Sequence, residues 1–480
     1  HRGTLTSMAR NKRSNRKSEL GLMDTEFLSV LTHENTNEKL DPLWKTVLVN
    51  QFHDILPGTS IHEVYEVTKQ EYQEVKETLE TIQDERLDDL TDTLNTDNKE
   101  AGSGLMVLNT TGFERSDIVD LGEVKAKALV DSQGKLWPVQ DTAQGGAIAY
   151  VDNLPAKGYE TFALSEETVE SESAFSFSDD FNLETPFYSV RFNEKGELAS
   201  VYDKENDREI LQEGQAGNVF RMYEDKPLDY DNWDIENYYV EKFWDWDTYD
   251  VFEWTEKGPV RASLHIEKSL SKSTLSEDIH FYKDKRRIDF VTKVDWKEAQ
   301  HLLKVHFPVD IHTDEATFDI QFGNLKRKTH TNTSWDVARF ECCGQKWVDL
   351  SEGHYGVSLL NDCKYGHSVH DSNIGLTLIK SGIVPNPVTD QEMHYFSYSL
   401  YPHAGDWRQG QTVKESYFFN QETFSRPVAL DSQKHLESFS LASVNKANVV
   451  IETIKYAVDD EDIIVRLYES DNAKTKASLS

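Results

Sequence analysis

One short segment of the chain concentrates the side chains best suited to chemistry. Asn50, Gln51, His53 and Asp54 lie together in the run NQFHDILPGTS, residues 50–60, after an apolar stripe with helical spacing. Polar groups that become buried at such a place need a partner. A metal ion would be one, because a neutral imidazole is a common metal ligand and a carboxylate accepts strong hydrogen bonds.

The residues alone leave two interpretations of His53 open. The first is a positive charge at the C-terminal end of a helix, where the helix dipole favours it. The second is a metal-binding or catalytic role. A single histidine does not make a zinc site, because zinc takes three or four protein ligands.

Helices are the elements that must position this segment. Apolar residues recur at helical spacing along three stretches in the first hundred residues. Asp41 and Pro42 offer an N-cap followed by proline at the first position of the second helix. Ser60 and Glu63 fit the capping box that begins a third. Short connections between the helices predict an antiparallel three-helix bundle over residues 1–100.

A basic run lies in the first of these helices. Its members are Arg10, Lys12, Arg13, Arg16 and Lys17. Such a run is typical of a localisation tract. Its helical spacing favours instead a solvated face, or ion pairs with the acidic domains that follow.

The pattern changes after a polar break at residues 97–104 to short alternating runs separated by turns. The clearest runs lie at 187–192, 197–202, 258–270, 287–296 and 302–311. They predict strands, and because no strands alternate with helices the sheets are expected to be antiparallel sandwiches. We place a small β domain at 101–165, a large β-sandwich at 166–426 and the start of a further β domain at 427–480. The predicted fold is therefore multidomain, a helical bundle followed by all-β sandwiches.

Composition excludes several classes of protein. At 480 residues the chain suggests roughly three or four domains. Hydrophobic residues make up 38% and aromatic residues 11%, which excludes a disordered chain. The net charge of −34 repels phosphate, so we expect neither nucleic acid nor a membrane as partner. No uncharged apolar stretch reaches the length of about 18 residues that a membrane helix needs.

Cysteine usage and the two ends of the sequence bear on the compartment and on the extent of the protein. Cys342, Cys343 and Cys363 cannot form a disulfide framework, and the opening HRGTLTS has no apolar stretch typical of a signal peptide. We therefore expect a reducing compartment, the cytoplasm. Because the sequence opens on His1 and ends soon after two strand-like runs at 449–469, we expect a segment of a longer protein.

The run NQFHDILPGTS, with HRGTLTS upstream, resembles the middle of a glycoside hydrolase family 38 α-mannosidase. The resemblance is closest to the cytosolic and bacterial branch of that family. It continues through runs at 223–235, 322–341, 346–352, 355–366 and 400–407.

The resemblance implies a metal-dependent, retaining α-mannosidase that hydrolyses α-linked mannose. Its catalytic α/β barrel would precede the bundle and the sandwiches, the large one galactose mutarotase-like. His53 would be one ligand of a divalent metal, zinc, and Asp54 would contact hydroxyls of the mannose. The nucleophile, the general acid and the remaining ligands belong to the barrel, so we name no catalytic residue in this sequence.

A second segment suits a sugar. Residues 225–246 are rich in aromatic and acidic side chains, which suit stacking and hydrogen bonding of a saccharide. We take Trp233 and Asp234 as candidate substrate-binding residues. The alternative is a loop that packs between domains, because most tryptophans are simply buried.

The expected partners are an α-mannoside substrate and the protein's own N-terminal barrel, and the sandwich faces offer surface for a homo-oligomer. Two other functions compete with the mannosidase. A non-catalytic carbohydrate-binding or assembly module would use the bundle as a spacer, but a spacer has no need of His53 and Asp54. A phosphomannosyl-glycerate hydrolase of the same family would need a phosphate pocket, and no basic cluster in the β region demands one.

Overall fold

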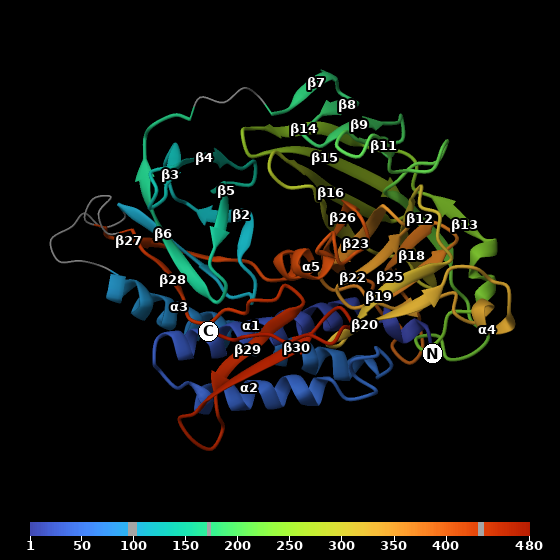
Figure 1. Ribbon diagram of the computed structural model, residues 1–480. Helices are drawn as coiled ribbons and strands as arrows, with labels where there is room; N and C mark the ends of the chain where they lie inside the picture. The colour runs from blue at the N-terminus through green and yellow to red at the C-terminus, as the bar shows by residue number, and fades with distance from the viewer. Residues whose placement is uncertain (95–102, 170–173, 431–435) are drawn as a thin grey trace.

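The computed structural model describes residues 1–94, 103–169, 174–430 and 436–480. Helices lie along one side of the molecule, with a small β domain and a large β-sandwich next to each other above them (Figure 1). This arrangement confirms the predicted fold of a helical bundle followed by antiparallel sheets. Most of the polar break at 97–104 lies outside the described residues, as does the boundary predicted after residue 100.

Three helices form the bundle: α1 (Ala9–Leu31), α2 (Asn37–Asn50) and α3 (His62–Leu94). Their shared core consists of Leu22, Leu40, Val47, Tyr72, Val75, Leu79 and Ile82. The predicted start of α2 is wrong, because the helix begins at Asn37 and Pro42 lies inside it. Pro42 has no N–H, so the helix there lacks one backbone hydrogen bond. The shorter helices are η1 (Gly3–Leu5), η2 (Asn237–Glu241), α4 (Ser334–Val337) and α5 (Thr412–Asn420).

The small β domain is built on one sheet, in the order β2-β5-β4-β3-β6-β1-β27 with β28 on β6. Its strands are β1 (Gly104–Asn109), β2 (Arg115–Gly122), β3 (Ala128–Val130), β4 (Leu136–Asp141), β5 (Ala147–Leu154), β6 (Gly158–Ser165), β27 (Phe424–Val428) and β28 (Ser438–Ser440). β27 and β28 come from beyond the large sandwich, so the boundary predicted at 426 falls inside a strand of this sheet. The sequence pattern does not show such pairing, because it joins segments far apart in the chain.

The large sandwich contains three sheets. A five-stranded sheet holds β7 (Ser176–Asp179), β8 (Asn182–Glu184), β9 (Tyr188–Phe192), β10 (Leu198–Asp203) and β11 (Arg208–Glu209). A six-stranded sheet holds β12 (Val219–Glu224), β13 (Phe243–Asp245), β18 (His301–Pro308), β21 (Cys342–Cys343), β24 (Gly366–His370) and β25 (Asn373–Lys380). A nine-stranded sheet holds β14 (Val251–Lys257), β15 (Arg261–Leu270), β16 (Ser273–Tyr282), β17 (Ile288–Asp295), β19 (Glu315–Ile320), β20 (Gly323–Lys328), β22 (Trp347–Ser351), β23 (Tyr355–Asn361) and β26 (Met393–Ala404).

One apolar core fills this sandwich. Its fully buried members include Phe220, Phe281, Phe290, Trp296 and Tyr398. The five alternating runs singled out in the sequence overlap β9, β10, β15, β17 and β18, which confirms those strands. Alternation identifies them because every second side chain of such a strand faces the core.

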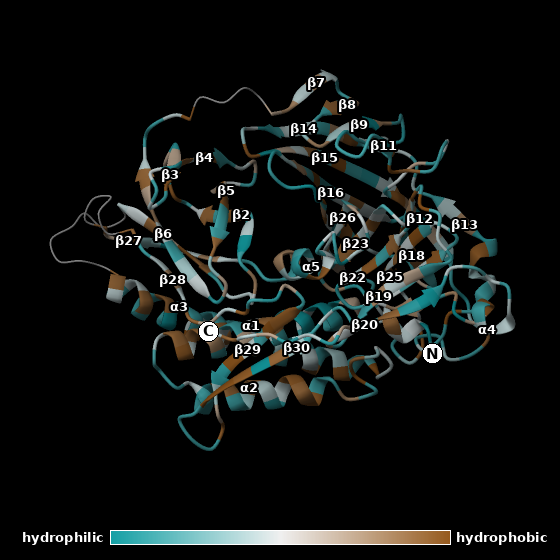
Figure 2. Cartoon of the chain, in the orientation of Figure 1, coloured by the Kyte–Doolittle hydropathy of each residue, from teal (hydrophilic) through white to brown (hydrophobic). Residues whose placement is uncertain are grey.

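The last two strands, β29 (Val449–Tyr456) and β30 (Ile463–Glu469), form a hairpin that lies against α1. Ile451 and Ile454 of β29 share a buried cluster with Phe27 and Leu28 of α1. Figure 2 shows hydrophobic residues along this hairpin and on the helices beside it. Packing on a helix supplies the support that an isolated two-stranded sheet lacks.

The basic run of α1 is not a solvated face. Lys12 and Arg16 are each only 5% exposed. Arg16 donates to the backbone carbonyls of Asn361 and Gln345 at 3.1 and 2.9 Å. Arg10 pairs with Glu392 at 2.6 Å, as the ion-pair alternative expected. These contacts dock α1 onto the large sandwich.

A buried charge cluster joins the small β domain to the large sandwich. Asp117 on β2 is 1% exposed. Three cations lie 3.0, 3.8 and 3.3 Å from its carboxylate: Arg115, Lys285 and Arg287. Both Lys285 and Arg287 also pair with Glu415 on α5. Burial alone would raise the pKa of Asp117, but the neighbouring cations hold it well below its ordinary value.

Neutralising Asp117 should destabilise the fold. Asp117→Asn removes the one described carboxylate that pairs with Arg115 and halves the pairing of Lys285 with carboxylates, so we expect the free energy of unfolding to fall by about 3–5 kcal/mol in urea denaturation. Asp41→Asn is the matched control, because Asp41 forms an exposed pair with Lys45 and its loss should cost less than about 1 kcal/mol. Equal effects of the two changes would contradict the proposed importance of the cluster.

Buried histidines predict a pH dependence of stability. His280, His367 and His394 are neutral in the fold, because burial lowers the pKa of each to about 3. In the unfolded chain histidine titrates near about 6.5, so below that pH the unfolded chain binds protons that the fold does not. Stability should therefore decrease as the pH is lowered from about 6.5 towards 3.

His280→Gln isolates one of these contributions. The variant should lose about 2 kcal/mol less stability than the wild type between about pH 6.5 and 5, since one shifted proton changes stability by about 1.4 kcal/mol per pH unit. Urea unfolding of both proteins across this range measures the difference. Parallel pH profiles of the two proteins would refute the assignment.

Candidate metal and substrate site

His53 and Asp54 lie in a turn that follows α2. The helix ends at Asn50, and the turn is closed by a bond from the Leu56 N–H to the Phe52 carbonyl at 3.1 Å. The His53 side chain is 77% exposed and that of Asp54 52% exposed, with 3.4 Å between His53 Nε2 and Asp54 Oδ2. Both groups can therefore reach a ligand outside the described chain.

The side chains of Lys12 and Ser60 donate to backbone carbonyls of the turn. Lys12 Nζ donates to the Leu56 carbonyl at 2.8 Å and to the Ser7 carbonyl at 2.5 Å. The Ser60 hydroxyl donates to the Asp54 carbonyl at 2.6 Å. Ser60 thus ties the turn to the start of α3, a contact that the predicted capping box with Glu63 did not foresee. The backbone that carries the exposed side chains of His53 and Asp54 is therefore held by the bonds from Lys12 and Ser60.

Gly58 is required where the turn meets the segment before α1. Its φ is +88°, which side chains rarely adopt, and an added Cβ would lie 2.4 Å from the Ser7 carbonyl oxygen. Only glycine permits this close approach. The close approach to Ser7 therefore explains why a glycine occupies this position of the run NQFHDILPGTS.

The second predicted segment lies against the same turn. Asn232 Nδ2 donates to the Gly58 carbonyl at 2.9 Å, and the Ser7 hydroxyl donates to the Asn232 carbonyl at 2.7 Å. Trp233 packs edge-on to Tyr230, with 6.1 Å between ring centroids. The neighbouring carboxylate, that of Asp234, is partly exposed. The structure therefore brings Trp233 and Asp234 to the edge of the molecule that carries His53.

Sequence reasoning missed Asn232 and Asp390. Asn232 is fully buried beside the two candidates named from the sequence, and only its contact with Gly58 reveals its role. Asp390, in the loop before β26, accepts bonds from the Met8 and Ala9 N–H groups at 2.7 Å each. It caps the first turn of α1, and burial raises the pKa of its carboxyl. Nothing in the local sequence pattern points from residue 390 to residue 8.

The residues described here do not hold a metal by themselves. Across the described ranges, no three His, Cys, Asp or Glu side chains lie together as a metal site would require. His53 fits the role of one ligand, because its imidazole is exposed and close to a carboxylate. A complete site would need further ligands from outside these residues.

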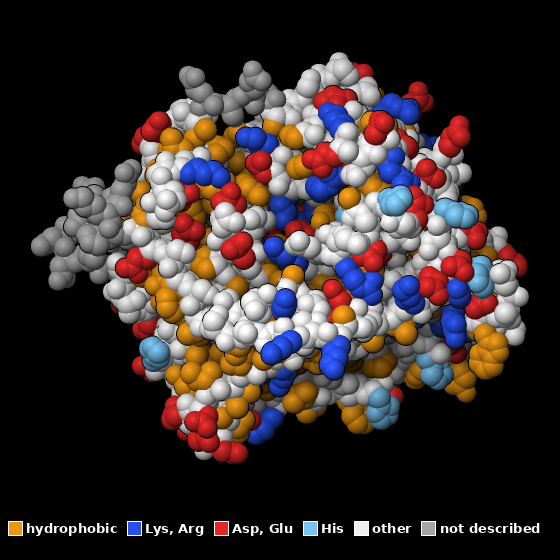
Figure 3. All heavy atoms as spheres, in the orientation of Figure 1, with side chains coloured by type: hydrophobic (Ala, Val, Ile, Leu, Met, Phe, Trp, Pro, Cys, Tyr) orange, Lys and Arg blue, Asp and Glu red, His pale blue; other side chains and the backbone are white. Residues whose placement is uncertain are grey.

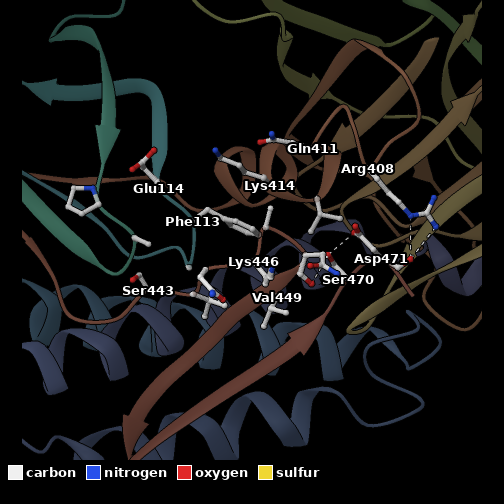
Figure 4. A pocket seen from close by; sticks show the side chains of 18 of the residues that line it. Phe113, Glu114, Arg408, Gln411, Lys414, Ser443, Lys446, Val449, Ser470 and Asp471 are labelled. Atoms are coloured by element: carbon white, nitrogen blue, oxygen red, sulfur yellow. Dashed lines mark hydrogen bonds between the residues drawn. The ribbon is translucent and has the colours of Figure 1, made fainter. Parts of the chain in front are cut away.

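The surface has two other features, one beside this site and one away from it. Hydrophobic side chains gather on the surface at the edge beside the start of the chain (Figure 3). A cavity of about 550 Å³ lies elsewhere, where the small β domain, α5 and the segment before β29 meet (Figure 4). Its lining includes Phe113, Arg408 and Lys414 but none of the predicted site residues.

Among the helices that the structure describes, none has the length and the hydropathy of a membrane-spanning segment.

Three domain families match the sequence. They are the alpha mannosidase middle domain over residues 1–90, the glycosyl hydrolases family 38 C-terminal domain over 183–388, and the glycosyl hydrolases family 38 C-terminal beta sandwich domain over 448–480. The chain belongs to glycosyl hydrolase family 38. Its bundle and large sandwich coincide with the first two of these family 38 matches.

Curated relatives of this family 38 chain share its whole length. It is 32% identical to Alpha-mannosidase G of Dictyostelium discoideum, and the aligned region covers 98% of the chain and 47% of that protein. It is 31% identical to human Alpha-mannosidase 2C1 and 30% identical to an Alpha-mannosidase of Saccharomyces cerevisiae, with 98% and 100% of the chain covered. The chain spans 44% and 43% of those two proteins, less than half of each.

A solved structure has the same fold. The crystal structure of an alpha-mannosidase from Enterococcus faecalis V583 superimposes on the whole chain with a TM-score of 0.82 at 15% identity. The chain covers 64% of that structure. At this identity the likeness establishes the fold, and it agrees with the family assignment.

Removing the Asn232 amide should loosen the turn. Asn232→Ala leaves the buried Gly58 carbonyl without its donor, which costs about 1–3 kcal/mol locally. We expect faster hydrogen exchange of the amides in residues 53–58, read by mass spectrometry. Asn237→Ala, at an exposed asparagine in η2, should leave that exchange unchanged. Unchanged exchange in Asn232→Ala would show that other contacts fix the turn.

Proposed function

We propose that this chain is the middle and C-terminal part of a retaining, metal-dependent α-mannosidase that hydrolyses α-linked mannose. The observation that carries the proposal is the exposed pair of His53 and Asp54 on a turn whose backbone carbonyls accept bonds from Lys12 and Ser60. A bundle that served only as a spacer would not need His53 and Asp54 side by side on this turn. The pair suits a site that another domain completes.

In this proposal His53 is one ligand of a divalent metal, zinc, whose other ligands lie in the barrel domain. When bound, the metal would polarise the 2- and 3-hydroxyls of mannose and stabilise developing charge. A neutral imidazole is an ordinary zinc ligand. The axial 2-hydroxyl obstructs attack on the anomeric carbon of mannose, which gives a reason to orient this group firmly.

Asp54, Trp233 and Asp234 would bind and orient the sugar. An ionised carboxylate accepts charge-assisted hydrogen bonds from hydroxyl groups, and Asp54 is exposed enough to do so. Trp233 offers a partly exposed ring on the same edge. The nucleophile and the acid/base, which a retaining glycosidase holds about 5–5.5 Å apart, would both come from the barrel.

The barrel would dock on the apolar surface around this turn. Phe52, Tyr230 and Val384 are 55%, 66% and 54% exposed. Asn232, two residues from Tyr230, donates to the Gly58 carbonyl through its side chain and to the Val384 carbonyl through its N–H, so the segments of Tyr230 and Val384 meet at the end of the turn. The curated relatives are more than twice as long as the chain, which leaves room in them for such a domain.

The proposed compartment is the cytoplasm. Cys342, Cys343 and Cys363 are all free thiols. Burial raises the pKa of each thiol, which keeps it protonated and unreactive. Such cysteines fit a reducing environment.

The test is His53→Ala in the full-length enzyme. We expect loss of bound zinc by metal analysis and a fall in mannosidase rate of at least about 100-fold, because a ligand is removed from the site. The matched control is His62→Ala, an exposed histidine nine residues on at the start of α3. It should retain both metal and rate.

Two outcomes would count against the proposal. Full zinc content in His53→Ala would remove His53 from the metal site. Equal losses in His53→Ala and His62→Ala would point to a general effect on the bundle. Thermal unfolding of both variants distinguishes a local defect from misfolding.

A further inference from the structure

A polar pocket lies on the large sandwich, away from the turn that carries His53. It has a volume of about 730 Å³ and opens where the β9–β10 hairpin faces the ends of β12, β18 and β25. That volume is within the range of about 300–1,000 Å³ typical of small-molecule sites. Its lining includes Arg191, Gln212, Gln215, Arg221, His306 and Asn373.

The back of the pocket is built around His306. Its Nε2 lies 2.8 Å from the Tyr223 hydroxyl, and its Nδ1 lies 3.1 Å from Asn373 Nδ2. Burial lowers the pKa of His306 to about 3, so the ring is neutral. Gly375 makes room for this ring, since an added Cβ would lie 3.2 Å from it. His306 therefore holds the Asn373 amide in one orientation.

This orientation leaves one acceptor unused. Asn373 Oδ1 is buried and has no hydrogen-bond partner among the described residues. A ligand hydroxyl that donated to this oxygen would satisfy it. Asn373 lines the pocket, so the unpaired acceptor belongs to its wall.

Three other side chains that line the pocket have hydrogen-bonding groups without a described partner. The side chains of Arg191, Gln212 and Gln215 make no hydrogen bond or ion pair with any described residue. An arginine supplies donors, and a glutamine supplies both a donor and an acceptor. Together with Asn373 Oδ1 they suit groups that donate and accept at once, as hydroxyls do.

Among the described residues, three cations line the pocket, and two of them are paired. Arg221 pairs with Asp245 at 2.6 Å, and Lys195 pairs with Asp247, outside the lining, at 3.3 Å. The third cation, Arg191, has no ion pair within that part of the chain, but the lining also contains the carboxylate of Glu197. The whole chain carries a net charge of −34, which disfavours an anion. The pocket therefore favours a neutral ligand.

We propose that this pocket binds a neutral saccharide unit, as a second carbohydrate site on the large sandwich. It is separate from the turn of His53. The loop with Asn232 follows the C-terminal end of β12, whereas the pocket contacts Val219 and Arg221 at its beginning. Strands rise about 3.3 Å per residue, so the length of β12 separates the two places. The proposal stands whether or not His53 binds metal.

The experiment measures binding of mannotriose and of methyl α-mannoside to the chain by saturation-transfer NMR and calorimetry. We expect saturable binding with a Kd of about 1 mM. The double variant Arg191→Ala/Gln212→Ala should weaken it at least about tenfold, or about 1.4 kcal/mol. Both side chains lie at the surface without partners, so the variant should fold, and thermal unfolding checks that it does.

Gln133→Ala, at an exposed glutamine of the small β domain outside the pocket, is the matched control and should bind the probes as the wild type does. Asp54→Ala is measured beside it to separate this pocket from the turn of His53. Loss of binding in Asp54→Ala with full binding in the double variant would overturn the second site while supporting the turn as the sugar site. No saturable binding at about 10 mM probe would also overturn it. Binding of inorganic phosphate in preference to either sugar would show that the pocket takes an anion.

Discussion

The buried carboxylate of Asp390 organises the part of the molecule that bears on function. It caps the first turn of α1 through the Met8 and Ala9 N–H groups. One turn further along the helix, Lys12 holds the Leu56 carbonyl of the turn that carries His53. The sandwich, the first helix and the turn are thereby linked by hydrogen bonds of two buried side chains. Burial lowers the pKa of Lys12 and raises that of Asp390, each to about 7. Because Lys12 and Asp390 are buried, removing either would leave unpaired polar groups.

The periodic parts of the fold were predictable from the sequence. Helical spacing located α1 and α3, and alternation located β9, β10, β15, β17 and β18, because burial of one face imposes a period on each element. The start of α2 was not predictable, since Asp41 and Pro42 imitate a helix start that lies in fact at Asn37. The pairing of β27 with β1 was not predictable either, because it depends on contacts between residues far apart in sequence.

For the candidate site, local sequence patterns could predict residues but not their contacts. The run NQFHDILPGTS predicted His53 and Asp54, and the aromatic and acidic segment predicted Trp233 and Asp234. The contacts that join the two segments pass through Asn232, whose side chain and backbone bond to residues more than 150 positions away. No local pattern reports such a contact. The pocket around His306 was missed because residues of six strands, β9, β10, β12, β13, β18 and β25, must meet to form it.

In the proposed function, His53 binds a metal whose other ligands come from a neighbouring domain. Diffraction from crystals of the full-length enzyme at the zinc absorption edge would locate that metal. We expect an anomalous peak about 2.0–2.1 Å from a ring nitrogen of His53, with Asp54 facing the same cleft. A zinc peak held entirely by other residues, with the His53 ring in bulk solvent, would contradict this expectation.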